Sequence, residues 1–162
     1  MPEYPRYLQG FDYVGFHRYS LTFRTFDHHE HFVEGSHVDL VLTQIVRSAT
    51  ENQCSIPAYC FMPDHLHLLV EGERDDADLR SFVARAKQFS GFHFSRQTGM
   101  RLWQRYGFER ILRDNEDPRI VARYIINNPV RKGLVNSPED YPYWGSTARS
   151  REELLEYVGW VD

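Results

Sequence analysis

The run Ser55–Glu71 predicts a β-hairpin with its turn at Met62-Pro63-Asp64. Successive side chains of a strand point to opposite faces, so His65 and His67 share one face. The residues between and after them, Leu66, Leu68 and Val70, point to the other face. The returning strand therefore presents two imidazoles on one side and apolar side chains on the other.

Two neutral imidazoles on the same face are half of a binding site for a divalent cation. The spacing of His65 and His67 alone also allows a pair of hydrogen-bonded surface histidines, because two ligands make only part of a metal site. The choice between these interpretations depends on residues further along the chain.

The segments around the hairpin alternate between strand and helix patterns. Apolar residues three and four apart predict helices, whereas alternation and β-branched or aromatic residues predict strands. Asp117-Pro118 is a helix start signal, and Asn128-Pro129 is a helix end signal. The predicted order is a strand at 13–25, a helix at 36–52, strands at 55–61 and 65–71, a helix at 76–96, a short strand within 102–112, a helix at 118–127 and a short helix near 151–158.

This order predicts an α+β fold, because antiparallel hairpins are combined with helices. The ferredoxin-like split β-α-β arrangement is the simplest match: an antiparallel sheet with helices packed on one face, plus a C-terminal helix that contains Tyr124. At 162 residues we expect a single domain over 1–162, with an N-terminal arm at 1–12 and a C-terminal tail at 146–162.

The composition argues against membrane and secreted proteins. No segment approaches the roughly 18 apolar residues of a membrane-spanning helix, and the first residues lack the apolar core of a signal peptide. Cys54 and Cys60 do not have CxxC spacing. We therefore expect a cytoplasmic protein with reduced cysteines and no membrane partner.

Charge is unevenly distributed along the chain. The net charge of −4 arises from −8 over residues 1–79, +8 over 80–132 and −4 over 133–162. A localised positive field matters more to a polyanionic partner than the total charge does. Solvated basic helix faces are an equally common explanation for such a segment.

Tyr124 and Asn128 are four residues apart, which places them on the same face of the predicted helix. Taken alone, Tyr124 is more simply explained as a buried residue of an apolar stripe with Ile120, Val121 and Ile125. Asn128 is equally well explained as the residue that ends the helix.

The combination of motifs resembles the HUH single-strand DNA endonucleases of the single-tyrosine transposase type. It looks closest to the REP-associated tyrosine transposases, which are relatives of small insertion-sequence transposases. The resemblance extends over residues 13–145. Its motifs are His65-Leu66-His67 within its hairpin, Leu102-Trp-Gln104, Arg123-Tyr-Ile-Ile-Asn-Asn-Pro-Val-Arg131 and Gly133-Leu-Val135.

This resemblance implies a metal-dependent single-stranded DNA endonuclease and strand transferase, acting on short palindromic or hairpin DNA through a 5′-phosphotyrosine intermediate. His65, His67 and Asn128 match the ligands of a divalent metal, Mg²⁺ or Mn²⁺, and Tyr124 matches the nucleophile. The implied partner is single-stranded or hairpin DNA, bound by a monomer or a homodimer.

The basic side chains of the central segment then become candidates for contacts with the DNA backbone. These candidates are Arg80, Arg85, Lys87, Arg96, Arg101, Arg105, Arg131 and Lys132.

Two other functions remain open at this point. A non-cutting DNA-hairpin binding protein derived from a transposase would keep the fold without the reaction. A metallohydrolase unrelated to DNA would use the histidine pair with the loop histidines His28, His29 and His31.

Overall fold

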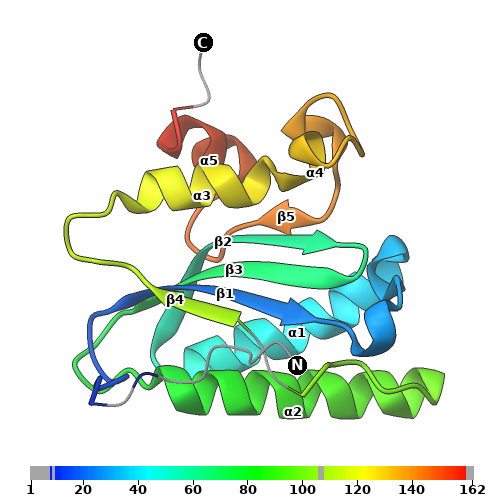
Figure 1. Ribbon diagram of the computed structural model, residues 1–162, viewed down its shortest axis with the longest axis horizontal. Helices are drawn as coiled ribbons and strands as arrows, with labels where there is room; N and C mark the ends of the chain where they lie inside the picture. The colour runs from blue at the N-terminus through cyan, green and yellow to red at the C-terminus, as the bar shows by residue number, and fades with distance from the viewer. Residues whose placement is uncertain (1–7, 9, 106–107, 160–162) are drawn as a thin grey trace.

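The centre of the molecule is a five-stranded antiparallel sheet with helices on both faces (Figure 1). The computed structural model describes residues 8, 10–105 and 108–159. The strand order across the sheet is β4-β1-β3-β2-β5. The strands are β1 (Arg18–Arg24), β2 (Cys54–Met62), β3 (His65–Gly72), β4 (Phe108–Ile111) and β5 (Trp144–Gly145).

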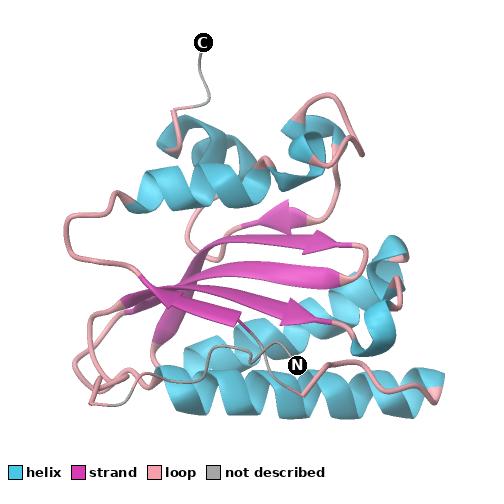
Figure 2. Ribbon diagram, in the orientation of Figure 1, coloured by secondary structure: helices cyan, strands magenta, loops and turns pink. Residues whose placement is uncertain are grey.

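Two long helices, α1 (Gly35–Glu51) and α2 (Leu79–Thr98), lie against one face of the sheet, below it in Figure 2. Together with β1 to β4 they give the strand and helix order of the split β-α-β arrangement. The predicted α+β class and ferredoxin-like sheet are therefore confirmed. The edge strand β5 was not predicted, because two residues are too few for a periodic pattern to be visible.

The other face of the sheet is covered by α3 (Pro118–Ile126), α4 (Asn128–Arg131) and α5 (Arg151–Tyr157). The buried residues of α3, Ala122, Ile125 and Ile126, belong to a core cluster that includes Cys60 of β2 and Leu69 of β3. The helix that contains Tyr124 thus lies across the sheet from α1 and α2. None of the described helices is both long and apolar enough to span a membrane.

The hairpin of β2 and β3 has the predicted alternation. Leu66, Leu68 and Val70 are buried in the core cluster shared with α1 and α2. His65 and His67 alternate with them and face the α3 side, as does Leu69, which packs in the α3 cluster. The predicted placement of the two histidines on one face is confirmed.

The first strand is shorter than predicted, since β1 begins at Arg18 rather than at residue 13. The strand pattern is interrupted at Gly15, whose φ of 114° is a conformation that side-chain-bearing residues rarely adopt. The chain there crosses close to the end of β3, where a Cβ added to Gly72 would lie 2.0 Å from the Gly15 carbonyl oxygen. Of the predicted N-terminal arm, residues 1–7 and 9 lie outside the described residues.

The apolar stripe predicted on the 118–127 helix was partly wrong. Ile120 is 64% exposed and Tyr124 is 60% exposed. The helix is short and has apolar residues on more than one face, so its sequence pattern does not show which face is buried. The face that packs on the sheet is the one that contains the small residue Ala122. After α3 ends at Ile126, the chain re-enters a helix at Asn128, because a proline in the first turn of a helix needs no backbone N–H.

Replacing Ala122 with leucine is expected to lower the free energy of unfolding by about 1–3 kcal/mol. Ala122 has no exposed surface where α3 meets the sheet, so a larger side chain must push the two apart. Urea denaturation measures the loss. The exposed substitution Ile120→Leu should change the unfolding free energy by less than about 0.5 kcal/mol. Equal stabilities of the two variants would contradict close packing at Ala122.

Candidate functional site

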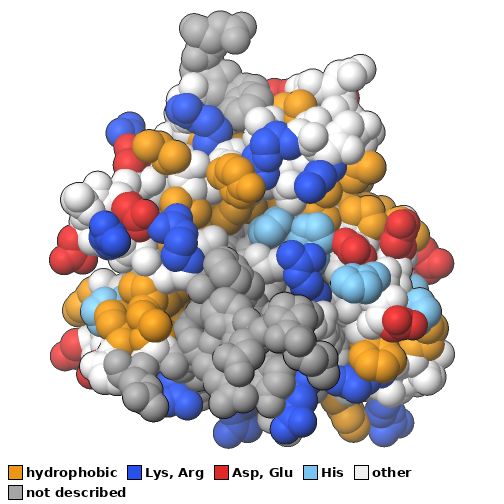
Figure 3. Space-filling view, viewed as in Figure 1, with side chains coloured by type: hydrophobic (Ala, Val, Ile, Leu, Met, Phe, Trp, Pro, Cys, Tyr) orange, Lys and Arg blue, Asp and Glu red, His pale blue; other side chains and the backbone are white. Residues whose placement is uncertain are grey.

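His65 and His67 lie at the start of β3, on the face of the sheet that α3 covers. Their Nε2 atoms are 3.1 Å apart, and their rings are nearly perpendicular. Figure 3 shows histidine side chains at the surface below α3 and α4, with Lys and Arg side chains around them. The two imidazoles therefore converge on one point at the start of the central strand β3.

The opposite nitrogen of each ring is held by a neighbouring side chain. His65 Nδ1 is 2.7 Å from Asp64 Oδ1. A carboxylate only accepts hydrogen bonds, so Nδ1 holds the proton of a neutral His65, and Nε2 keeps its lone pair. His67 Nδ1 is 3.1 Å from Thr22 Oγ1, which lies directly across from it on β1. These contacts fix the ring orientations, as the outer partners of metal-binding histidines do.

Both histidines are held in their neutral form. Burial lowers the pKa of His65, although the hydrogen bond to Asp64 acts in the opposite direction. Burial also lowers the pKa of His67 to about 3, with further contributions from the charges of His65, Arg24, Arg131 and Lys132. At neutral pH the pair therefore has no imidazolium charge to repel a cation.

The separation of the two nitrogens fits a shared metal ion. Two nitrogens at about 2.1 Å from one octahedral ion lie about 3.0 Å apart, close to the observed 3.1 Å. Within the part of the chain that the structure describes, no group of three or more His, Cys, Asp or Glu side chains is placed to hold an ion. Further ligands would therefore be an amide, water or a substrate oxygen.

Asn128 is the buried amide on the same side of the sheet. Its side chain is 2% exposed, and its Nδ2 atom is buried without a hydrogen-bond partner. Its Oδ1 atom accepts a hydrogen bond from Arg131 at 3.1 Å. The unpaired Nδ2 is a donor and cannot bind a cation, so Asn128 would hold a metal through Oδ1, which has a second lone pair beside the one that accepts from Arg131.

Arg131 connects Asn128 with Tyr124. Its guanidinium carbon lies 3.6 Å from the centre of the Tyr124 ring. One of its terminal nitrogens donates to the Tyr124 carbonyl oxygen at 2.5 Å, while the other donates to Asn128 Oδ1. The structure thus brings together the tyrosine and the amide named by the sequence, and it adds a cation against the tyrosine ring.

Sequence reasoning missed two residues around the histidine pair, Thr22 and Arg24. Thr22 and Arg24 face the histidines only because β1 pairs with β3 in the register Thr22↔His67 and Arg24↔His65. No local pattern reveals that register. The sequence placed Asp64 in the turn before His65, and the structure adds its contact with His65 Nδ1.

The fold divides the predicted DNA-contacting residues into separate groups. Arg80, Arg85 and Arg96 are exposed on α2, across the sheet from the histidines. Lys87 is half-buried with its Nζ 5.1 Å from the centre of the Phe23 ring, and burial lowers its pKa to about 8.

The other four candidates lie elsewhere. Arg101 and Arg105 are exposed in the segment that follows α2. Arg131 and Lys132 are exposed at the end of α4, and their charges act on His67. The basic residues are thus not one continuous surface, and Arg131 and Lys132 are the members of the predicted set that influence the histidine pair.

The loop histidines do not extend the histidine pair into a larger metal site. His31 is buried against Phe94 of α2, with ring centres 4.7 Å apart. His28 is exposed, and its Nδ1 lies 4.0 Å from Asp64 Oδ2 rather than beside His65.

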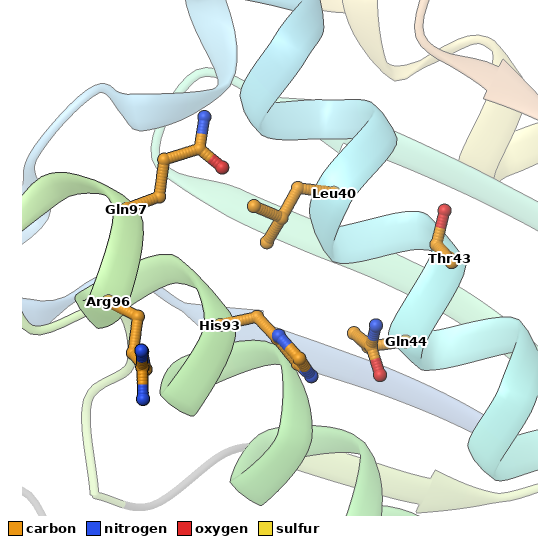
Figure 4. Close-up of a pocket in the computed structure, with 6 residues that line it drawn as sticks. All are labelled: Leu40, Thr43, Gln44, His93, Arg96 and Gln97. Carbon is orange, nitrogen blue, oxygen red and sulfur yellow. The ribbon is translucent and has the colours of Figure 1, made fainter.

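A pocket lies away from the histidine pair, between α1 and α2 (Figure 4). Figure 4 shows side chains from both helices around it, including His93 and Gln44. Its lining residues are Leu40, Thr43, Gln44, His93, Arg96 and Gln97. Because α1 and α2 cover the opposite face of the sheet, this pocket is separate from the histidine site.

Comparison with known proteins gives a consistent set of relatives. Residues 15–128 match the family described as transposase, IS200-like. A Haemophilus influenzae protein assigned as a REP-associated tyrosine transposase is 34% identical over 113 residues, covering 60% of this chain and 64% of that protein. The REP-associated tyrosine transposase of Escherichia coli is 27% identical over 100 residues, covering 61% of this chain and 58% of that protein. The match therefore spans less than two thirds of either relative's length.

Two solved structures share the fold. A REP-associated tyrosine transposase bound to a REP hairpin superposes with a TM-score of 0.71 and 23% identity, covering 89% of this chain and 82% of that chain. A Deinococcus radiodurans protein assigned as a transposase superposes with a TM-score of 0.51 and 23% identity, covering 76% of this chain and 97% of that chain. At these identities the likeness concerns the fold.

Proposed function

Since the chain belongs to the IS200-like transposase family, we propose that it is a metal-dependent single-stranded DNA endonuclease and strand transferase. The converging Nε2 atoms of His65 and His67 support this proposal most directly. Two neutral imidazoles aimed at one point, each fixed by a partner on its other nitrogen, are arranged to hold a cation rather than to pack a core. His65, His67 and Asn128 would hold Mg²⁺ or Mn²⁺.

In the proposed reaction the Tyr124 hydroxyl oxygen attacks a DNA phosphorus. A bond forms between that oxygen and phosphorus, the bond to the 3′ oxygen breaks, and the strand leaves as a free 3′-OH. The DNA 5′ end remains on the protein as a phosphotyrosine, which keeps the bond energy for rejoining. The bound divalent ion would neutralise charge on the phosphate oxygens. The exposure of Tyr124 supports its role, because a nucleophile must reach its substrate.

Arg131 is proposed to act on the tyrosine as well as on DNA. The Arg131 guanidinium lies against the Tyr124 ring and also holds the Asn128 amide oxygen. It would therefore keep the nucleophile and the amide in a fixed relative position.

Replacing Arg131 with lysine is expected to slow adduct formation by about 10- to 100-fold, the usual loss when a supporting group is removed. Lysine keeps the charge, but it has one nitrogen instead of two terminal nitrogens to reach the two acceptors, and it cannot stack as a plane. Single-turnover rates measure the effect, with DNA affinity determined separately. A matched control is Arg149→Lys, because Arg149, which precedes α5, stacks on the ring of Tyr157 in α5. Equal rates for the two variants would rule out the positioning role.

Replacing Thr22 with valine is expected to weaken metal binding by about 10-fold or more, since it removes the partner of His67 Nδ1 at nearly unchanged volume. Titration with Mn²⁺, followed by its paramagnetic signal, measures the affinity. Thr43→Val is the control, because Thr43 bonds only within α1. Unaltered Mn²⁺ affinity in Thr22→Val would show that this hydrogen bond does not orient a ligand.

The proposed DNA substrate is a short palindromic or hairpin sequence with a single-stranded part. The structural relative bound to a REP hairpin supports a hairpin as the substrate class. Arg24, Arg131 and Lys132 support binding of a polyanion at the histidine pair, since their charges act on His67.

The proposed function is tested by incubating the protein with fragmented, denatured DNA from its source organism and Mg²⁺ or Mn²⁺. Mass spectrometry should find a nucleotide adduct on Tyr124, and sequencing of the attached strand would give the site. DNA retained without an adduct would instead indicate a non-cutting hairpin-binding protein. Neither retention nor adduct, together with hydrolysis of small phosphoesters, would indicate a metallohydrolase.

A further inference from the structure

An exposed aromatic ring lies just beyond the end of β1, the strand that pairs with β3 at His65 and His67. Thr22 and Arg24 of β1 face His67 and His65, and the chain then enters the short helix η1 (Phe26–His28). The intervening Thr25 donates from its amide to the Asp64 carbonyl oxygen, and its hydroxyl lies within hydrogen-bond distance of the carbonyl oxygens of His29 and Asp64. The segment that bears Phe26 is thus attached to the turn from which His65 starts.

The Phe26 ring is exposed although its backbone is held in place. Its amide donates to the Leu102 carbonyl oxygen at 2.8 Å, yet the residue is 41% exposed. The guanidinium carbon of Arg101 lies 4.3 Å from the ring centre, and Arg101 Nε donates to the Trp103 carbonyl oxygen at 3.0 Å. A planar cation and an apolar ring are therefore stacked at the surface in a fixed arrangement.

We propose that Phe26 and Arg101 form a stacking site for an unpaired base of the DNA strand whose phosphate lies at the histidine pair. This inference rests on the proposed function and adds a binding site for the nucleobase beside the reacting phosphate. An exposed ring stabilises an unpaired base of any identity by stacking, and arginine adds attraction to both the base and the phosphate.

Other aromatic residues fit this role less well. Trp103, in the segment after α2, is buried and donates from its indole nitrogen to Ser90 Oγ at 2.8 Å. Phe92 is exposed and has Arg96 above its ring at 5.7 Å, but it belongs to α2 on the far side of the sheet. Phe26 combines exposure, a stacked cation and attachment to the histidine hairpin.

The stacking site is tested by comparing how the wild-type protein and its variants bind DNA with bases and DNA without bases. The probes are a pool of random-sequence single-stranded oligonucleotides of one length and an abasic oligomer of the same length and charge. Affinities are measured by fluorescence anisotropy with EDTA present, so that binding is separated from cleavage. The wild-type protein should bind the strand with bases more tightly than the abasic strand. In Phe26→Ala this ratio of affinities should fall by about 5- to 150-fold, which is the contribution of one stacked base.

Two further variants serve as controls. Phe26→Trp should retain the preference for bases, because indole stacks at least as well as phenyl, whereas Phe92→Ala should behave as the wild type. Affinity for the abasic strand should be unchanged in Phe26→Ala, which also excludes misfolding. An undiminished base preference in Phe26→Ala would overturn the stacking site while leaving the proposed function intact. Absence of DNA binding by the wild-type protein would overturn both.

Discussion

The substitution Tyr124→Phe is expected to eliminate the covalent protein–DNA adduct while DNA affinity stays within about twofold of the wild type. The substitution removes one hydroxyl oxygen, which is the atom proposed to form the bond to phosphorus. Loss of a nucleophile typically lowers the rate by on the order of 10³-fold or more. The exposed ring and its stacking with Arg131 remain, so folding and binding should be preserved. Denaturing gel electrophoresis with end-labelled DNA measures the adduct.

The chain offers a closely matched control for this experiment. Tyr157 of α5 also has an arginine stacked on its ring, with the Arg149 guanidinium carbon 3.7 Å from the ring centre. Tyr157→Phe removes the same atom from a similar environment and should form the adduct at the wild-type rate. Persistent adduct in Tyr124→Phe would show that another residue is the nucleophile. Loss of the adduct in both variants would point to a general effect on folding.

The sequence predicted the sheet and its two long helices because each of these elements is long enough to display its own period. The β2–β3 hairpin is the best example, since its alternation alone placed His65 and His67 opposite Leu66 and Leu68. By contrast, β5 has two residues and forms only because it pairs with β2. Its existence depends on the tertiary structure and leaves no local signal.

The position of Tyr124 shows a second limit of pattern reasoning. Ile120 and Tyr124 share an apolar spacing that is typical of a buried stripe, yet both are exposed. Ala122 occupies the buried face instead, because a small side chain allows α3 to lie close to the sheet. The exposed position is what a nucleophile requires, so the departure from the expected pattern occurs at a proposed functional residue.

The charge pattern predicts a polyanionic partner, but it does not identify the surface that would bind it. The central segment has a net charge of +8 over residues 80–132, and the fold distributes that segment over both faces of the sheet. Arg24, from the acidic N-terminal half, lies closer to the histidines than any α2 arginine by virtue of its pairing with His65. The net charge of one segment of the sequence therefore does not identify a binding surface, because strand pairing brings residues from distant segments together.

Replacing His67 with alanine is expected to abolish metal-dependent adduct formation, with a rate loss on the order of 10³-fold or more. His67 is one of two converging imidazoles, and removal of either leaves a single nitrogen ligand. It also leaves the Thr22 hydroxyl without its partner. Adduct formation is measured over a range of Mg²⁺ and Mn²⁺ concentrations, alongside direct Mn²⁺ titration of the protein without DNA.

The comparison with Tyr124→Phe separates the two parts of the site. His67→Ala should lose both Mn²⁺ binding and the adduct, whereas Tyr124→Phe should lose the adduct and keep Mn²⁺ binding. The control is His93→Ala on α2, which removes an exposed imidazole beside the pocket across the sheet and should change neither property. Normal adduct formation by His67→Ala at every metal concentration would exclude the metal site formed by the histidine pair. Normal Mn²⁺ affinity with lost activity would instead place the ion elsewhere and leave His67 a role in contacting the DNA phosphate.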